Sequence, residues 1–228
     1  MKKCSKTQIS FFLNALAALG AMLGVFLACY FARRDGYTHW GKKLLYFTQL
    51  SNIWIGVVCL VCAVYALAAR NKKKEPYPPC LSALKFVFTV SITVTAIVFC
   101  TFLAPFADFN VWTFSSVLTH VVVPALSIAD FFVNERIRPL KKHVYYSLLP
   151  PLFYFIFASV LCLNNVDFGR GDPYPYFFMN FRSPVGLFGF DGSGDLPQFG
   201  AVYWIILILL LILGLSRLYF RLHPKTRK

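Results

Sequence analysis

The sequence contains six apolar runs, each close to the length that a bilayer-spanning helix requires. An α-helix rises about 1.5 Å per residue and the hydrocarbon core is about 30 Å thick, so one span needs about 20 residues. The runs predict an all-α polytopic membrane bundle of six transmembrane helices, forming one domain over residues 1–228. The expected spans cover residues 9–32, 43–69, 82–104, 111–133, 144–163 and 199–221.

The basic residues agree with this interpretation and orient the bundle. The chain is 58% hydrophobic and has a formal net charge of +14, which in a soluble protein would suggest nucleic-acid binding. Here the Lys and Arg residues gather between and after the apolar runs, so we expect no nucleic-acid partner. Most of them flank the N-terminus, the second and fourth loops and the C-terminus, counting Lys85 at the start of the third span. Both termini are therefore expected in the cytoplasm.

The seven cysteines do not predict a disulfide or metal framework. Five of them fall within the expected spans, where thiols behave as small apolar groups. Cys59 and Cys62 form a single C-x-x-C pair with no second pair to complete a zinc site. An intramembrane zinc hydrolase needs several ligands at one depth, whereas three of the four histidines lie at loops or in the tail. We therefore expect no metal and no cofactor.

One histidine lies deep within an apolar run. His120 is near the middle of the stretch 111–135. At about 100° per residue, a helix places four polar residues within about 40° of it, namely Thr113, Ser116, Ser127 and Asn134. Pro124 has no backbone N–H, so the helical hydrogen bond to the carbonyl of His120 is missing and a kink is expected. An ionisable side chain at membrane depth indicates a candidate functional site.

The second run has a polar face near its start. On a helix, Ser51 lies at about −60° and Asn52 at about +40° from Thr48. Such groups often form hydrogen bonds between membrane helices. With His120 as a base, Thr48 or Ser51 is a candidate nucleophile, and Asn52 or a freed backbone N–H is a candidate oxyanion donor. The depths of Thr48 and His120 agree if the second helix begins near Trp40 or if the helices tilt.

The fifth loop, residues 164–198, is long, rich in aromatic residues and interrupted by Asp-Pro, Tyr-Pro and Ser-Pro steps. It is expected either to rest in the membrane interface as an aromatic anchor or to fold over the mouth of the bundle as a lid. In the second arrangement, Tyr174, Tyr176 and Phe177 are candidates for shaping the substrate mouth.

Several short motifs resemble one family of membrane proteins. The second run's YFTQLSN, the fourth run's THVVVPALSIADFF, the loop's DPYPYFF and the six-span layout are similar to the androgen-induced membrane proteins and their bacterial six-helix relatives. The resemblance implies an intramembrane hydrolase of fatty acid esters of hydroxy fatty acids, whose catalytic threonine and histidine correspond to Thr48 and His120. The T-Q-L-S-N segment is closer to the bacterial branch, which implies a bacterial cytoplasmic membrane and leaves another lipid ester open as the substrate.

Together these features predict an enzyme that takes a lipid ester laterally from the bilayer. Thr48 would attack the carbonyl, His120 would act as base and then as acid, and the expected partners are the ester and membrane lipids, with the oligomeric state left open. Two other classes stay open. One is a non-catalytic lipid-binding or scaffold protein whose polar faces form interhelical hydrogen bonds. The other is a small proton-coupled transporter, although the sequence has no convincing internal repeat.

Overall fold

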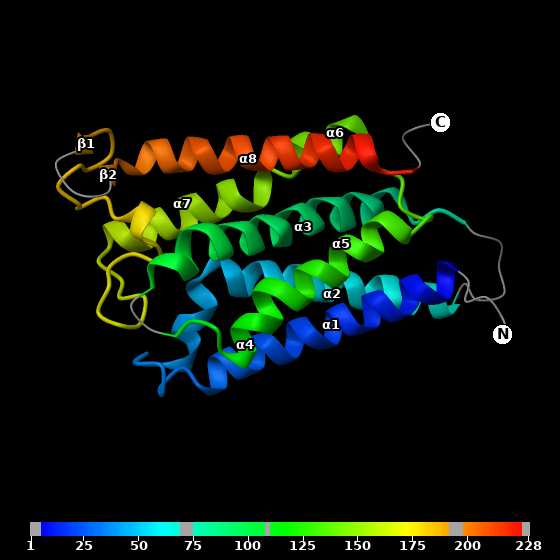
Figure 1. Ribbon diagram of the computed structural model, residues 1–228, viewed down its shortest axis with the longest axis horizontal. Helices are drawn as coiled ribbons and strands as arrows, with labels where there is room; N and C mark the ends of the chain where they lie inside the picture. Colours follow the sequence, from blue (N-terminus) through cyan, green and yellow to red (C-terminus); the bar gives the residue numbers. More distant parts are fainter. Residues whose placement is uncertain (1–5, 69–74, 108–109, 192–197, 225–228) are drawn as a thin grey trace.

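A computed structural model describes residues 6–68, 75–107, 110–191 and 198–224, and within this part of the chain six helices are long and apolar enough to span a membrane (Figure 1). The expected all-α bundle is confirmed, and the ends of the spans agree with the sequence-based limits to within four residues. The helices are α1 (Lys6–Tyr30), α2 (Phe47–Ala68), α3 (Pro79–Val98), α4 (Phe114–Val117), α5 (Val123–Val133), α6 (Lys141–Tyr146), α7 (Leu149–Leu163) and α8 (Ala201–Leu222). The fourth span comprises α4 and α5, and the fifth comprises α6 and α7.

The first turn of α1 and the last turn of α8 lie at the same end of the bundle, which we call the terminal end (Figure 1). The opposite end, the loop end, holds a short antiparallel hairpin of β1 (Phe190–Asp191) and β2 (Gln198–Phe199). The charge distribution predicts that the terminal end faces the cytoplasm. Many of the basic residues behind this assignment, in segments 1–5, 69–74 and 225–228, lie outside the described residues.

Helix α1 packs closely on α2 and on the fourth span because small residues form its buried face. A Cβ atom on Gly24 would lie 2.7 Å from Thr119 Cγ2, and one on Gly56 of α2 would lie 3.0 Å from Ala21 Cβ. Small residues allow such close approach between membrane helices, where dispersion contacts replace the hydrophobic effect as the driving force. Close contact with Gly24 therefore helps to position the segment that contains Thr119.

Two spans contain a π-helical turn near the loop end. The third span continues from α3 through η2 (Phe99–Leu103) and a 3₁₀ turn, η3 (Ala104–Phe106). The fourth is interrupted between α4 and α5 by η4 (Leu118–Val122), where Val123 N–H donates to the carbonyl five residues back. Pro124 follows immediately, and it cannot donate to the carbonyl of His120. The disruption expected at this proline takes the form of a π-helical turn, a feature that is frequent at functional sites.

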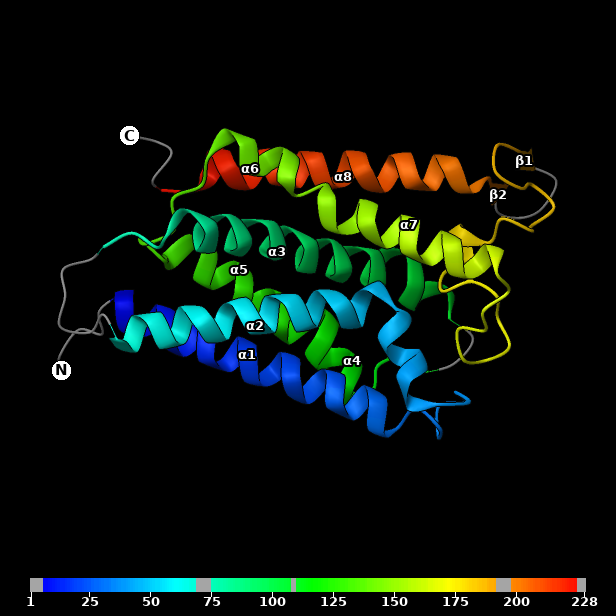
Figure 2. The same cartoon turned by 180° about the vertical axis from the view of Figure 1, so that it is seen from behind.

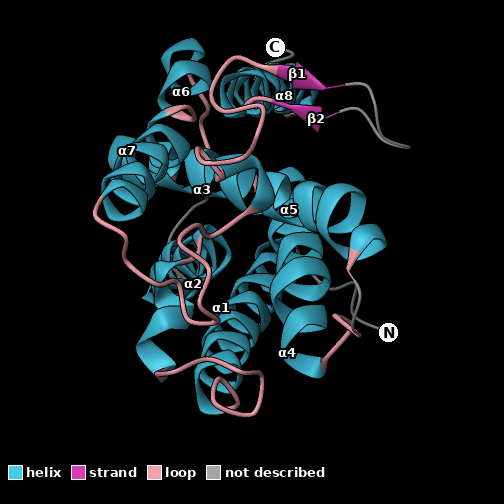
Figure 3. Ribbon diagram, turned by 90° about the vertical axis from the view of Figure 1, so that its left-hand side faces the viewer, coloured by secondary structure: helices cyan, strands magenta, loops and turns pink. Residues whose placement is uncertain are grey.

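The long loop divides into two parts with different surroundings. In the first, the 3₁₀ turn η5 (Phe177–Met179) buries Phe178 and Met179 against the core. In the second, Phe188 and Phe190 are exposed and the hairpin lies beside the end of α8 (Figure 3). The first part therefore covers the bundle as a lid would, whereas the second presents aromatic side chains in the way expected of an interfacial anchor.

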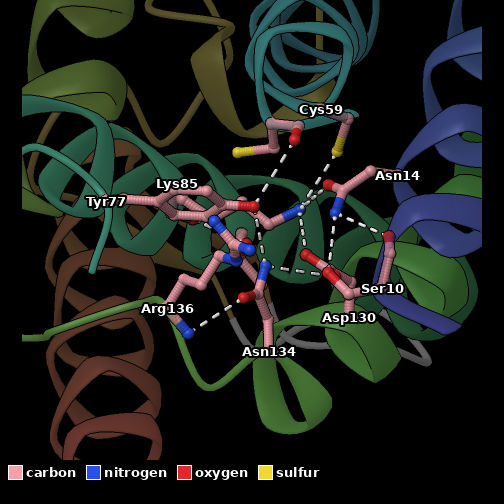
Figure 4. A network of polar contacts seen from close by, with 10 residues as sticks. Ser10, Asn14, Cys59, Tyr77, Lys85, Asp130, Asn134 and Arg136 are labelled. Atoms are coloured by element: carbon pink, nitrogen blue, oxygen red, sulfur yellow. Dashed lines mark hydrogen bonds and ion pairs between the residues drawn. The ribbon is translucent and has the colours of Figure 1, made fainter. Parts of the chain in front are cut away.

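A buried ion pair joins the helices in the half of the bundle nearer the terminal end. Lys85 Nζ lies 2.9 Å from Asp130 Oδ2, and both side chains are 0% exposed. The ammonium also donates to Asn14 Oδ1 at 2.8 Å and to Cys59 Sγ at 3.1 Å. Ser10 Oγ donates to Asp130 Oδ1 at 2.6 Å. These contacts connect α1, α2, α3 and α5 through one polar network (Figure 4).

Lys85 does not lie at the membrane surface, where the sequence predicts it as one of the basic residues that orient the bundle. It is fully buried and neutralised by Asp130. It therefore says nothing about which side of the membrane its end of α3 faces. The network also extends to the loop after α2, because Asn134 Nδ2 donates to Asp130 Oδ1 at 3.4 Å and to Tyr77 Oη at 3.1 Å.

We expect Asp130→Ala to lower the free energy of unfolding by about 3–5 kcal/mol, because it leaves the Lys85 ammonium buried without its counter-charge. The double variant Lys85→Met/Asp130→Val leaves no unpaired charge and should recover part of this loss. Thermal unfolding of the purified protein in detergent measures both effects. Lys6→Ala is the control, because the Lys6–Glu135 ion pair at 2.7 Å is largely exposed and should contribute about 1 kcal/mol or less. An Asp130→Ala variant as stable as the parent would contradict the expectation.

Candidate active site

The structure brings Thr48 and His120 together. Thr48 is the second residue of α2 and His120 is the central residue of η4, and the two side chains are 8% and 7% exposed. His120 Nε2 lies 3.4 Å from Thr48 Oγ1. This is slightly longer than an ideal hydrogen bond, as is common for catalytic pairs when no substrate is bound. The polar face of the second span and the histidine of the fourth thus share one depth in the bundle.

The hydrogen bonds of His120 define which ring nitrogen is the base. His120 Nδ1 lies 2.9 Å from the carbonyl oxygen of Ser116, which can only accept, so Nδ1 carries the proton. Thr119 Oγ1, 3.2 Å from Nδ1, also accepts from it, because the Thr119 hydroxyl donates to the Ser115 carbonyl at 2.9 Å. Nε2 is then unprotonated and faces the Thr48 hydroxyl, which donates to it.

A stacked aromatic ring fixes the plane of the imidazole. The ring centroids of Phe99 and His120 are 3.6 Å apart and the planes differ by 14°. Phe99 is the first residue of η2, so the two π-helical turns meet at the histidine. Stacking holds the imidazole on one face while its nitrogen atoms remain available at the edge.

A short helical segment precedes α2 at the loop end of the bundle. The chain enters as a 3₁₀ helix, η1 (Trp40–Leu45), which is set at an angle to α2 (Figure 2). Tyr46 has extended backbone angles and separates the two segments, so α2 begins only at Phe47. The sequence required the second helix to begin near Trp40 for the two depths to match. It begins instead at Phe47, after the separate turn η1, and the two side chains still meet. Thr48 consequently lies at the N-terminus of α2, where the helix dipole favours negative charge.

Tyr176 of the loop is in contact with Thr48. The backbone N–H of Thr48 donates to Tyr176 Oη at 3.4 Å. Burial raises the pKa of the Tyr176 phenol to about 12, although hydrogen bonds with Thr48 and Phe47 act in the opposite direction. The phenol is therefore protonated at neutral pH, and its hydrogen is available for another acceptor. Its ring stacks on Phe178, with centroids 5.1 Å apart, which anchors it to the buried part of the loop.

The other two mouth candidates lie elsewhere. Tyr174 packs against the core without bordering the cavities beside Thr48. Phe177 is largely exposed, and its ring contacts Trp204 of α8 with centroids 5.2 Å apart. Of the three residues that the sequence suggested, only Tyr176 lies at the Thr48–His120 pair.

Ser51 and Asn52 hold helices together. Ser51 Oγ donates to the Thr48 carbonyl at 3.0 Å and lies 2.8 Å from Thr95 Oγ1 on α3. Asn52 Nδ2 donates to the carbonyls of Thr48 at 2.8 Å and of Thr119 at 3.2 Å. Both hydrogens of the amide are thus bound to backbone oxygen atoms. In this arrangement the two side chains connect α2 to the third and fourth spans, and neither faces the space beside the Thr48 hydroxyl.

The polar stripe predicted around His120 divides between two sites. Thr113 caps α4, with its hydroxyl accepting from Ser116 N–H at 3.3 Å, and the Ser116 carbonyl orients His120. Asn134, at the other end of the span, belongs to the Lys85 network. Ser127 is buried between them, and its hydroxyl has no hydrogen-bond partner among the described residues.

A polar cavity of about 740 Å³ lies among the segments at the loop end, and Thr48 and His120 both border it. Its other polar walls include three basic residues and one carboxylate, Arg34, Lys43, Arg170 and Asp35. Lys43 Nζ lies 3.2 Å from Asp35 Oδ2, so one of the three positive charges is balanced locally. The cavity is thus a positively charged space at whose wall the Thr48–His120 pair lies.

A second, apolar pocket of about 40 Å³ lies on the other side of Thr48. Its apolar walls come from the start of α2 and from α3, α7, η5 and α8, and include Val94, Val98, Phe155, Phe178 and Ile208. Thr48 and Tyr176 border both spaces. The candidate nucleophile therefore lies at the junction of a positively charged cavity and an apolar pocket.

Several site residues were not identified from the sequence. Phe99, Gln49 and the basic residues of the cavity could not be assigned, because nothing in their local pattern indicates the contacts they make. Gln49 follows Thr48 directly, and its position in the YFTQLSN segment was the one available signal. The described residues contain no group of three or more His, Cys, Asp or Glu side chains that could bind a metal ion.

Comparison with known proteins gives no family for this chain. No protein-family model matches it, and neither a curated protein nor a solved structure is similar to it. The resemblance to the androgen-induced membrane proteins therefore remains a prediction from short motifs. The candidate active site is identified by the geometry around Thr48 and His120.

Proposed function

We propose that this protein is an intramembrane hydrolase that cleaves a lipid ester, with Thr48 as nucleophile and His120 as general base. The observation that carries the proposal is the 3.4 Å contact between Thr48 Oγ1 and His120 Nε2 at the junction of a polar cavity and an apolar pocket. A hydroxyl beside an oriented, unprotonated imidazole is the arrangement that activates a weak nucleophile. We propose a bacterial cytoplasmic membrane as its location, because this is what the resemblance implies.

The first half of the reaction forms an ester on Thr48. His120 Nε2 takes the hydroxyl proton as Thr48 Oγ1 attacks the carbonyl carbon of the substrate. The tetrahedral intermediate collapses when the bond to the leaving oxygen breaks, and His120 returns its proton to that oxygen. The alcohol product leaves, and the acyl group remains bound to Thr48.

The negative oxygen of the intermediate requires hydrogen-bond donors. The Tyr176 hydroxyl is one candidate, since its oxygen already accepts from Thr48 N–H and its hydrogen can point toward the substrate. The N-terminus of α2 adds a partial positive charge at the same position. In this proposal Tyr176 takes the role that the sequence had suggested for Asn52, whose amide hydrogens bind backbone carbonyls.

The two spaces beside Thr48 suit an amphiphilic ester. The apolar pocket, at about 40 Å³, would take only the first carbons of an acyl chain beside the ester, whereas a substrate portion with a negative charge would be attracted to the cavity of Arg34, Lys43 and Arg170. Fatty acid esters of hydroxy fatty acids, the substrates that the resemblance implies, combine an ester with a free carboxylate. They are therefore the first substrates to test.

We expect Thr48→Ala and His120→Ala each to reduce ester hydrolysis by purified protein in detergent by about 10³-fold or more, because neither half of the pair acts alone. The assay measures fatty acid released from a fatty acid ester of a hydroxy fatty acid. Ser51→Ala is the matched control, since it removes a hydroxyl one turn away whose contacts are with Thr95 and the Thr48 carbonyl. This variant should keep most of its activity.

A fluorophosphonate probe distinguishes the hydrolase from a non-catalytic lipid-binding or scaffold protein. In the hydrolase, labelling is covalent and disappears in Thr48→Ala. Full activity in Thr48→Ala would exclude this residue as the nucleophile, and absence of both labelling and hydrolysis in the parent protein would favour the scaffold.

Tyr176→Phe should lower kcat by about 10²-fold while changing KM little, because an oxyanion donor acts mainly in the transition state. Steady-state kinetics on the same ester gives both constants. Tyr174→Phe removes a hydroxyl from a neighbouring residue that does not border the cavities and serves as the control. Equal kcat values for Tyr176→Phe and the parent would remove Tyr176 from the oxyanion site.

A proton-coupled transporter is the second candidate, and the Lys85–Asp130 pair is the observation that favours it. Buried ionisable pairs often mark proton or ion paths in membrane proteins. Ser10 and Asn134, which contact Asp130, also border a small cavity of about 10 Å³ at the terminal end. Uptake driven by a pH gradient in proteoliposomes, abolished by Asp130→Asn and unaffected by Thr48→Ala, would support transport over hydrolysis.

A further inference from the structure

Gln49 is a buried polar side chain whose carbonyl has no partner. It is 7% exposed, borders the 740 Å³ cavity beside Thr48 and His120, and its Oε1 accepts no hydrogen bond from the described residues. Leaving a buried acceptor unpaired costs about 1–3 kcal/mol. An unpaired acceptor at the wall of a cavity indicates a ligand that donates a hydrogen bond there.

The neighbouring amide, Asn52, does not border the cavity. Its Oδ1 also has no hydrogen-bond partner among the described residues, but Asn52 is 0% exposed and its nitrogen donates to two carbonyls. Asn52 is therefore fixed within the helix contacts. Gln49 is the amide on α2 whose side chain borders the cavity.

The donor that the proposed reaction requires at this wall is water. Once Thr48 carries an acyl group, Oγ1 has no hydrogen, and His120 Nε2 loses the donor that it has in the free protein. The side chains of His120 and Gln49 both border the cavity and supply one acceptor each, Nε2 and Oε1, and a water molecule has two hydrogens to donate. We propose that Gln49 positions the water molecule that hydrolyses the Thr48 ester, an inference that rests on the proposed function.

In the second half of the reaction, water hydrolyses the Thr48 ester. The water oxygen attacks the acyl carbon while one of its hydrogens passes to His120 Nε2 and the other stays hydrogen-bonded to Gln49 Oε1. The tetrahedral intermediate breaks its bond to Thr48 Oγ1, which takes the proton back from Nε2. A carboxylic acid is released and the Thr48 hydroxyl is restored. Gln49 gains and loses no proton and acts as a positioning residue.

The test separates the two halves of the reaction with a p-nitrophenyl ester of a fatty acid. In Gln49→Leu, acylation continues and hydrolysis of the acyl group slows. We expect a burst of p-nitrophenolate close to one equivalent, a kcat at least tenfold below the parent value and an unchanged kcat/KM. Intact-mass spectrometry of the quenched protein should detect one acyl group, and Thr48→Ala in the same background should remove it.

Two further variants at Gln49 test whether a hydrogen-bond acceptor is what matters at this position. Gln49→Glu keeps an acceptor at this position and should accumulate less acyl-protein than Gln49→Leu. Gln49→Met replaces the side chain with an apolar one of similar length and repeats the test if the leucine variant does not fold. Thermal unfolding checks each variant, and little loss is expected because Gln49 Oε1 makes no hydrogen bond in the free protein.

The outcomes separate this inference from the proposed function. A parallel fall of kcat and kcat/KM without acyl-protein would place Gln49 in acylation and overturn the water-positioning role. Unchanged kinetics in Gln49→Leu, with turnover still dependent on Thr48, would overturn it and leave the hydrolase intact. Absence of Thr48 acylation and of turnover in the parent protein would overturn both.

Discussion

Lipid offers no hydrogen-bond partners, so every polar group inside this bundle has to find one in the protein or in a water-filled space. Most do so with each other. Lys85 and Asp130 neutralise one another with Asn14 and Ser10 around them, and Asn52 binds backbone carbonyls on two spans. Thr48, His120 and Gln49, by contrast, are buried polar residues that border the polar cavity. The distinction between polar groups that hold the helices together and those that border the cavity locates the candidate site.

Much of the fold follows from local properties of the sequence. A continuous apolar run of about 20 residues has no stable alternative to a spanning helix in a bilayer, so the six spans and their limits were predictable. The pairing of the second and fourth spans was also predictable in outline. His120 required a polar partner at its depth, and the face containing Thr48 supplies one, although α2 begins at Phe47 and not near Trp40.

Other features depend on contacts that no local pattern specifies. A helical projection assumes about 100° for each residue, whereas the π-helical turns η2 and η4 change the register at the depth where Phe99 meets His120. Lys85 near the start of an apolar run looks like a surface charge until Asp130, from another span, is placed beside it. Tyr176 reaches Thr48 because the loop folds back over the bundle, which depends on burial of Phe178 and Met179.

The Lys85–Asp130 pair has a consequence for the way the chain enters the membrane. Lys85 is synthesised 45 residues before Asp130, so the third span can be inserted before its counter-charge exists. A lysine at the centre of a span costs about 2.5–3.5 kcal/mol to insert, so Lys85, which lies nearer the start of its span, costs less, and the strongly apolar remainder of α3 can offset that cost. Asn14 and Cys59, its two other partners, belong to spans that are already made. The order of synthesis therefore supplies the ammonium with neutral partners first, and the fourth span brings the carboxylate that completes the polar network.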